Sequence, residues 1–184
     1  MVYETERHVA IEAVRKATHI CLQVQADQDP LEYLEKVDGS PVTVADLACQ
    51  VIITHHLSEA FPQDLIIAEE DSVELTKPDN RLALNDVVRC VRQFLPNINN
   101  ETVCQLLDTA CHTVDRRFWA LDPIDGTKGF LRRQQYAIAL ALIENEQVQF
   151  SILGCPALPL ARDASREESG IIVFAVRGQG AFEA

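Results

Sequence analysis

The sequence predicts an α+β fold in which two N-terminal helices precede a mainly antiparallel sheet. From residue 4 to residue 25, apolar side chains recur at steps of three and four, which is the period of one face of a helix. The second half of the chain holds short apolar runs bounded by polar turns, and such runs are typical of buried strands. A chain of 184 residues is long enough to bury one sizeable core around these elements.

Three further helices are expected along the chain. One starts near Thr43, whose hydroxyl is suited to cap the first N–H groups of a helix, and runs to about Ala60. Two more are expected at residues 81–95 and 100–112, because a Pro-Asn pair interrupts the helical pattern between them.

Strands are expected at five apolar runs. A short polar turn joins the third and fourth runs, which predicts a hairpin. Residues 26–41 contain an Asp-Pro and an Asp-Gly pair and are expected to form loop and turn, and residues 162–169 to form a polar connection. The five runs are residues 65–68, 118–121, 136–143, 148–154 and 171–176.

The charge balance restricts the partners of this protein. The chain carries 16 Lys and Arg residues against 28 Asp and Glu residues, so its formal net charge is −12. This argues against binding to polymeric DNA or RNA, which depends on cations that neutralise phosphates. No apolar run approaches the length of a membrane span, and the N-terminus lacks the pattern of a signal peptide, so we expect a cytoplasmic protein without a membrane partner.

Clustered carboxylates follow two of the predicted strands. Glu69 and Glu70 come after the first strand, and Asp122 and Asp125 come after the second. Acidic side chains gathered at strand ends repel one another unless a cation lies between them. Mg²⁺ fits this arrangement, because it takes a few carboxylates and keeps water molecules for substrate phosphate.

A turn beside these carboxylates is suited to bind an anion. If Gly126 and Thr127 open a helix, their N–H groups point at whatever lies in front of the metal. Metal ions and free N–H groups at one place match the needs of phosphate-ester hydrolysis. Each motif alone is also compatible with a plain surface turn.

Three motifs together resemble a known family. They are residues 119–127 (WALDPIDGT), residues 67–70 (IAEE) and residues 40–46 (SPVTVAD). Their order and spacing resemble the Mg²⁺-dependent, lithium-sensitive phosphatases of the inositol monophosphatase superfamily. Residues 38–43 and 126–132 look most like the 3′(2′),5′-bisphosphate nucleotidase branch, which removes the 3′-phosphate of adenosine 3′,5′-bisphosphate to give AMP and so clears a by-product of sulfate activation.

The resemblance implies a set of metal ligands. Glu69 and Asp122 would hold a first Mg²⁺ together with the carbonyl oxygen of Ile124. Asp122 would bridge to a second ion that Asp125 also binds. The family uses two or three Mg²⁺ ions, and inhibition by Li⁺ is implied as well.

The resemblance also implies catalytic and substrate-binding roles. Asp46 and Thr127 would orient and deprotonate the attacking water, and Glu70 would assist through a further water. The N–H groups of Gly126 and Thr127 would hold the phosphate. Two basic residues are weaker candidates for substrate contact, with a solvated surface role as the alternative: Lys128 and Arg132.

The resemblance places the chain in a larger architecture. It implies the N-terminal half of a layered αβαβα sugar-phosphatase fold, so that residues 1–184 form one metal-binding phosphatase domain. Family members continue into a second α/β domain with a Trp-Asp-x-Ala-like motif, which is not found after Phe182. We therefore expect an incomplete site. An inositol phosphate or polyphosphate phosphatase and a non-catalytic metal- or nucleotide-binding module remain alternatives, and the oligomeric state stays open.

Overall fold

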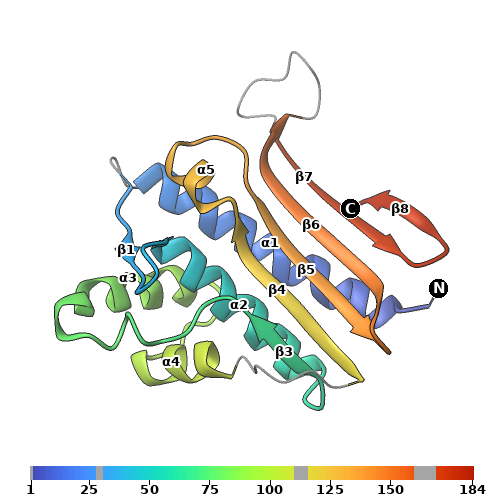
Figure 1. The fold of residues 1–184 in the computed structure, drawn as a ribbon, viewed down its shortest axis with the longest axis horizontal. Coiled ribbons are helices and arrows are strands. Elements are labelled where there is room, and N and C mark those ends of the chain that lie inside the picture. The colour runs from blue at the N-terminus through green and yellow to red at the C-terminus, as the bar shows by residue number, and fades with distance from the viewer. Residues whose placement is uncertain (1, 28–30, 110–115, 160–168) are drawn as a thin grey trace.

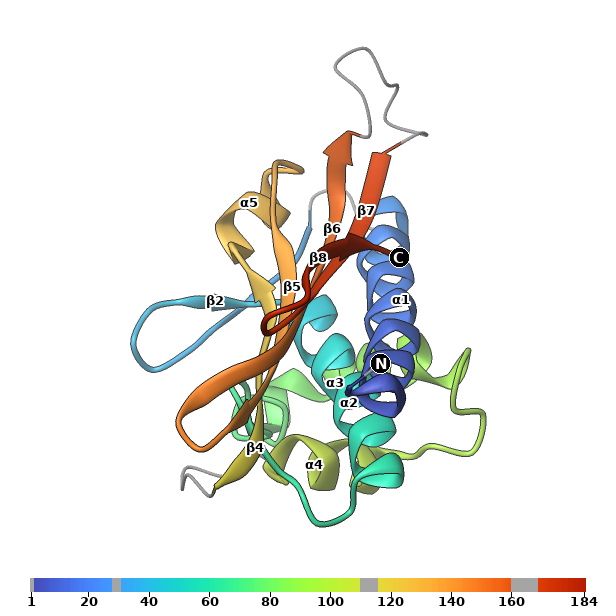
Figure 2. The same cartoon turned by 90° about the vertical axis from the view of Figure 1, so that its right-hand side faces the viewer.

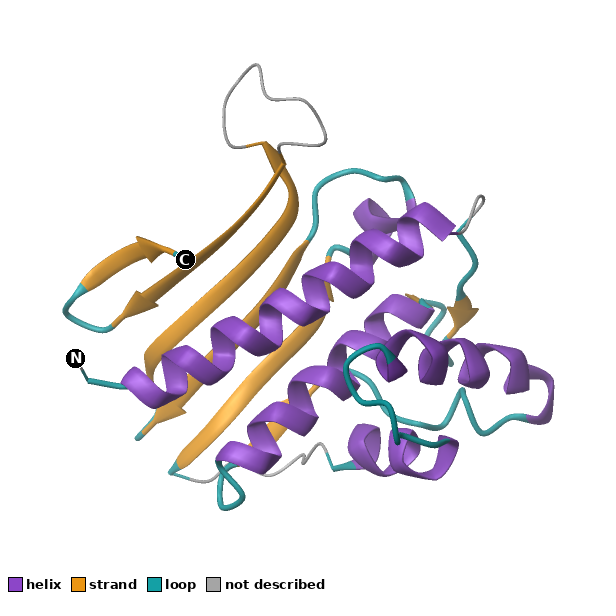
Figure 3. Cartoon of the chain, turned by 180° about the vertical axis from the view of Figure 1, so that it is seen from behind, coloured by secondary structure: helices purple, strands orange, loops and turns teal. Residues whose placement is uncertain are grey.

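Two long helices cover one face of a six-stranded sheet. The computed structural model describes residues 2–27, 31–109, 116–159 and 169–184. Helix α1 (Glu4–Asp27) packs against β5 (Ala137–Glu144) and β6 (Gln147–Pro159), and α2 (Val44–Ala60) packs against α1 and β4 (Arg117–Asp125). Figure 3 shows both helices crossing the back of the sheet, and Figure 2 shows the helices and the sheet as separate layers. The predicted α+β architecture is therefore confirmed.

The sheet is mainly antiparallel, as predicted, with one parallel pair at its edge. Its strand order is β3-β4-β5-β6-β7-β8, which follows the order of the chain (Figure 1). Only β3 and β4 run parallel among these pairs, because the segment that contains α3 (Arg81–Arg92) and α4 (Asn100–Asp108) returns the chain to the end of the sheet at which β3 started. The strands are β3 (Leu65–Ala68), β4 (Arg117–Asp125), β5 (Ala137–Glu144), β6 (Gln147–Pro159), β7 (Ser169–Val176) and β8 (Gly180–Glu183).

Helix α2 lies at the centre of the molecule. Thr43 caps it in a capping box with Asp46, which confirms the start expected from the sequence. Every residue from Val44 to Thr54 is buried, because the sheet and α1 lie on one side and α3 (Arg81–Arg92) and α4 (Asn100–Asp108) lie on the other. A polar side chain on this part of α2 therefore carries a free-energy cost unless it has a hydrogen-bond partner inside the protein.

The structure differs from the sequence-based prediction in several elements. The expected loop at residues 26–41 contains a small hairpin of β1 (Leu34–Glu35) and β2 (Pro41–Val42). The expected helix at residues 81–95 ends at Arg92 and follows a short 3-10 turn (Pro78–Asn80), and β8 had not been expected. Residues 110–112 of the expected fourth helix and residues 162–168 lie outside the described residues.

Strand β4 is longer than expected. It was predicted to stop at Leu121 but pairs with β5 as far as Asp125, with an irregular register between Asp122 and Asp125. Pro123 lies in this interval and has no N–H group to donate to the ladder. Two of the predicted metal-binding carboxylates therefore lie on a distorted strand end instead of a free turn.

None of the helices in the described ranges combines the length and apolar character that crossing a membrane requires. A short helix, α5 (Thr127–Leu131), follows β4 after Gly126, so the helix start that the sequence analysis considered for residues 126 and 127 is present.

We predict that Gly129→Ala destabilises the protein by about 2 kcal/mol or more, because overpacking against a rigid neighbour carries such a cost. A Cβ atom at Gly129 would lie 2.2 Å from the carbonyl oxygen of Gln135, so α5 would have to move away from the next segment. Gly178→Ala is the control, because its φ of 74° is unfavourable but its surroundings are open; it should cost about 1 kcal/mol. Equal losses in urea unfolding would contradict the close approach at Gly129.

Candidate functional site

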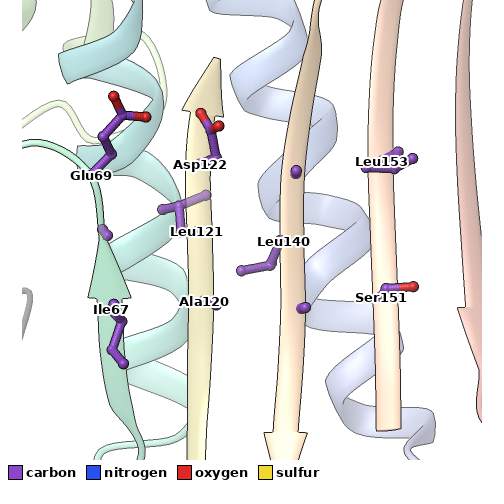
Figure 4. A pocket seen from close by; sticks show the side chains of 11 residues that line it. Ile67, Glu69, Ala120, Leu121, Asp122, Leu140, Ser151 and Leu153 are labelled. Atoms are coloured by element: carbon purple, nitrogen blue, oxygen red, sulfur yellow. The ribbon is translucent and has the colours of Figure 1, made fainter. Parts of the chain in front are cut away.

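The parallel pairing of β3 and β4 brings two acidic strand ends together. Ala68 pairs with Leu121, so the residues that follow them, Glu69 and Asp122, lie next to each other at one edge of the sheet. Figure 4 shows both carboxylates at the same end of the two strands. Residues 53 positions apart in the sequence thus become neighbours because the two strands run in the same direction.

Asp122 lies in a crowded negative environment. Its pKa is raised to about 6, first by burial and in addition by the nearby charges of Glu69 and Asp125. Its Oδ1 atom accepts one hydrogen bond, of 3.1 Å, from the N–H group of Ile124. Asp125 is exposed at the end of β4. The protein therefore holds a carboxylate where the negative charge is disfavoured.

Asp46 and Thr127 form a pair across two elements. The Thr127 hydroxyl at the start of α5 lies 3.2 Å from Oδ1 of Asp46 on α2, and 3.3 Å from the carbonyl oxygen of Ile124. Asp46 is 1% exposed, and its other oxygen accepts hydrogen bonds from the N–H and hydroxyl groups of Thr43. Burial raises the pKa of Asp46 to about 6, although the hydrogen bonds from Thr43 and Thr127 oppose that rise.

Lys36 is a site residue that the sequence reasoning missed. Its Nζ atom lies 3.2 Å from Oε1 of Glu69 and 2.9 Å and 3.1 Å from the two carboxylate oxygens of Glu70. Glu70 is only 5% exposed, and burial raises its pKa to about 7 while the Lys36 ammonium opposes the rise. The sequence did predict that the acidic strand ends need a cation nearby. It did not point to Lys36, because that residue lies in a segment predicted to be a loop.

Gln50 is a second residue that was missed. Its side-chain amide donates to the carbonyl oxygen of Glu70, and its side-chain oxygen accepts from the N–H group of Glu70 at 2.9 Å. This fully buried side chain fixes the backbone where the chain leaves β3. A single amide side chain among apolar neighbours on a helix could have indicated Gln50, because a buried polar side chain needs a hydrogen-bond partner.

Gly126 shapes the turn between β4 and α5. Its φ of 93° lies in the left-handed region, and its carbonyl oxygen accepts from the N–H groups of Gly129 and Phe130. The first N–H groups of a helix have no acceptor within the helix, so those beside Gly126 are available to an external anion. Gly126 is exposed and Thr127 is half-buried at this edge.

An uncovered hollow of about 480 Å³ lies on the sheet face opposite α1 and α2. Figure 4 shows Glu69 and Asp122 at one end of it, while the rest of the surface is mostly apolar. Leu153 is 41% exposed there. The lining residues are Ile67, Ala68, Glu69, Ala120, Leu121, Asp122, Ala139, Leu140, Ala141, Ser151 and Leu153.

The remaining predicted residues, Lys128 and Arg132, line a different hollow together with Tyr33. The structure therefore brings Glu69, Asp122, Asp46 and Thr127 to one edge of the sheet and directs the two basic side chains to a neighbouring surface. In the described part of the chain, no three Asp, Glu, His or Cys side chains are close enough to enclose a metal ion by themselves.

Comparison with known proteins identifies the relatives of this chain. The sequence profile of the inositol monophosphatase family matches residues 2–183. A 3′(2′),5′-bisphosphate nucleotidase of Schizosaccharomyces pombe is 38% identical over 202 aligned residues, which cover 100% of this chain and 56% of the relative. One of Dictyostelium discoideum is 39% identical, covering 96% of this chain and 54% of the relative. The chain thus spans about half the length of these curated relatives.

Solved structures show the same fold. An inositol monophosphatase of Thermotoga maritima aligns with a TM-score of 0.60 at 21% identity and covers 97% of this chain and 51% of its own. CysQ of Bacteroides thetaiotaomicron aligns with a TM-score of 0.57 at 21% identity, and the alignment covers 100% of this chain and 50% of CysQ. Because the family profile matches nearly every residue and the relatives reach this identity over almost the whole length, the chain belongs to the inositol monophosphatase family.

Proposed function

We propose that this chain carries the metal-binding part of a phosphatase that removes the 3′-phosphate of adenosine 3′,5′-bisphosphate. The observation that carries the proposal is the meeting of Glu69 and Asp122 with the Asp46–Thr127 pair at one edge of the sheet. The relatives described as 3′(2′),5′-bisphosphate nucleotidases support the choice of a nucleotide substrate.

The oxygen atoms at this edge suit Mg²⁺. Glu69, Asp122 and the carbonyl oxygen of Ile124 would hold one ion, and Asp122 and Asp125 a second. The absence of a closed three-carboxylate cluster among the described residues is compatible with this ion, because Mg²⁺ in phosphate sites often takes one or two carboxylates and keeps several waters. The raised pKa of Asp122 indicates a place where a cation stabilises the charged carboxylate. When bound, Mg²⁺ lowers the pKa of a water molecule and offsets the charge of the phosphate.

The Asp46–Thr127 pair is suited to orient that water. When the Thr127 hydroxyl donates its hydrogen to Asp46, its oxygen lone pairs remain available to accept a hydrogen bond from water. Asp46 lies behind it as a buried acceptor for the proton that the water releases. The N–H groups beside Gly126 would hold the phosphate. Glu70 would orient a further water from the position that Lys36 and Gln50 maintain.

We further propose that residues 1–184 form one domain whose site a second polypeptide segment completes. The mostly apolar hollow beside Glu69 and Asp122 supports this, because exposed apolar surface of this kind marks an interaction site. The relatives, which are about twice as long as the matched region, contain a further segment that is available for that role.

The proposal is tested on this chain joined to the second half of the Dictyostelium discoideum relative. We expect phosphate release from adenosine 3′,5′-bisphosphate that requires Mg²⁺ and is inhibited by Li⁺. Thr127→Val should lower kcat by about 10²-fold or more, as expected for loss of a group that positions a proton acceptor. The control is Thr54→Val on α2, which should leave kcat unchanged, since the buried Thr54 hydroxyl has no hydrogen-bond partner among the residues that the structure describes.

Two results would contradict this proposal. Cleavage of inositol 1-phosphate with no action on the nucleotide would assign the chain to an inositol phosphatase. Binding of Mg²⁺ and nucleotide without turnover would assign it to a non-catalytic module.

Asp122→Asn should weaken Mg²⁺ binding to the 184-residue chain by about tenfold or more, because it removes the charge of the central ligand. Isothermal titration of Mg²⁺ measures this. Asp79→Asn removes the same charge from an exposed position in the 3-10 turn and should leave the affinity unchanged. Equal affinity of the Asp122 variant and the unmodified chain would place the metal elsewhere.

The raised pKa of Asp122 predicts a pH-dependent stability in the metal-free chain. The folded protein keeps this proton up to about pH 6, whereas the unfolded chain releases it near the ordinary value of 3.8. The stabilising contribution is therefore complete below that value and is lost as pH rises through 6. The melting temperature of Asp122→Asn should rise relative to the unmodified chain over this range, and Mg²⁺ at neutral pH should reduce the difference. A difference that does not change with pH would contradict the raised pKa of Asp122.

A further inference from the structure

The helix that carries Thr127 is too short to hold its own position. Helix α5 has five residues, and a helix of this length is not stable in water without contacts to the rest of the protein. Its first residue, Thr127, lies 3.2 Å from Asp46, so a displacement of α5 changes the distance between the two groups that are proposed to orient the attacking water. The contacts that fix α5 therefore also fix the site.

The C-terminal end of α1 is joined to α5 by two hydrogen bonds that run in opposite directions. The side-chain amide of Gln25 donates to the carbonyl oxygen of Phe130 in α5 at 3.0 Å. The guanidinium of Arg133, just after α5, donates to the carbonyl oxygen of Gln25. The bonded residues are 105 and 108 positions apart in the sequence, and Figure 1 shows α5 beside this end of α1.

The carbonyl group of Gln25 is one that α1 leaves without a donor. The last four carbonyl groups of a helix have no N–H partner within it, and α1 ends at Asp27. A cation near the C-terminus of a helix is also favoured by the helix dipole. The last turn of α1 contains no basic residue of its own. Arg133 therefore supplies, from another segment, both the donor and the positive charge that this end of α1 lacks.

Arg133 has an unfavourable backbone conformation. Its φ is 55°, in the left-handed region that residues with a side chain rarely adopt and that glycine adopts freely. A residue in such a conformation persists where the surrounding structure holds it, and residues of this kind cluster at functional sites. Arg133 is half-buried, and its contact with α1 is an interaction that glycine could not make.

Helix α5 is thus held at both ends by directional contacts. Asp46 on α2 holds its first residue, and the two bonds to α1 hold its last turn. Between them the ring of Phe130 is fully buried. Apolar burial keeps α5 against the core but is non-directional, whereas hydrogen bonds depend on angle as well as distance. The link to α1 therefore restrains how α5 is oriented.

We propose that Gln25 and Arg133 are positioning residues of the hydrolytic site, which hold α5 so that Thr127 keeps its contact with Asp46. Neither residue is assigned a contact with the substrate. The inference rests on the proposed function, because it gives a catalytic consequence to a contact remote from the reacting groups. A misplacement of about 1 Å can lower a rate about 10²-fold, so loss of the pair should lower kcat and leave KM unchanged.

The kinetic test uses the enzyme joined to the second half of the Dictyostelium discoideum relative. Arg133→Gly permits the same backbone conformation and removes the guanidinium, so it should lower kcat about tenfold with KM unchanged and the melting temperature close to that of the unmodified enzyme. Gln25→Met keeps the length of the side chain, removes the donor and should also lower kcat about tenfold. Arg133→Lys keeps a charged donor and should recover most of the activity.

Hydrogen exchange of the 184-residue chain gives a readout that does not depend on catalysis. The N–H groups of Gly129 and Phe130 donate to the carbonyl oxygen of Gly126 within the first turn of α5. Both should exchange about tenfold faster in Arg133→Gly and in Gln25→Met, because α5 opens more often when its link to α1 is lost. The exchange rates in α3 should not change.

Two matched variants serve as controls. Gln23 lies two residues before Gln25 on α1, but its side chain accepts a hydrogen bond from Gln93 and has no printed contact with α5 to lose, so Gln23→Met should leave kcat and the exchange of α5 unchanged. Arg177→Gly removes a guanidinium from the exposed turn between β7 and β8 and should also change neither.

The proposal is overturned if Arg133→Gly and Gln25→Met keep both kcat and the exchange rates of α5, if their kcat falls only in proportion to a lower melting temperature, or if Gln23→Met lowers kcat as much as Gln25→Met. These outcomes are separate from the failure of the proposed function. Faster exchange of α5 in both variants, together with a joined enzyme that does not act on the nucleotide, would remove the proposed function and support the link. Full activity of both variants would keep the function and remove the positioning role.

Discussion

The burial of several carboxylates close together at one edge of the sheet is the constraint on which the site depends. Asp46, Glu70 and Asp122 all have raised pKa values, mainly because they are buried, and the neighbouring acidic groups add to the rise for Glu70 and Asp122. Such a cluster is stable only when positive charge and hydrogen-bond donors are close by. The Lys36 ammonium supplies the charge for Glu69 and Glu70, and backbone and hydroxyl donors serve Asp46. No cationic side chain at ion-pair distance from Asp122 is found among the described residues, which is consistent with a metal ion at that end of the edge.

Helix α2 connects the core to this edge through hydrogen bonds. The sheet and three other helices enclose α2, and two of its buried polar side chains, Asp46 and Gln50, are hydrogen-bonded to the segments that follow β4 and β3. Gln50 is hydrogen-bonded to the backbone of Glu70, and Asp46 is hydrogen-bonded to Thr127 at the start of α5. The ends of β3 and β4 are therefore both anchored to the same helix. A site built on rigid elements holds its donors and acceptors in place without reorganisation at the moment of reaction.

The two faces of the sheet have different roles. The face beneath α1 and α2 buries Trp119 and the other large side chains of the core. The opposite face carries small and apolar side chains beside the carboxylates and is uncovered in the described residues. The β1–β2 hairpin lies at the margin of this second face, where Lys36 contacts the acidic edge and Tyr33 faces α5.

The sequence by itself determined the elements whose signals are local. The 3.6-residue period of α1, the Thr43 cap of α2 and the apolar run of β3 each depend on residues within a few positions of one another, and all three appear in the structure. The order of the motifs also located the acidic strand ends. Only the tertiary structure decided the parallel register that places Glu69 beside Asp122. It also decided the contact of Asp46 with Thr127, which are 81 residues apart in the sequence. The same is true of the hairpin that brings Lys36 to Glu70. The physical reason is that these contacts depend on strand direction and on charge balance among distant elements, and neither is encoded in the periodicity of a single segment.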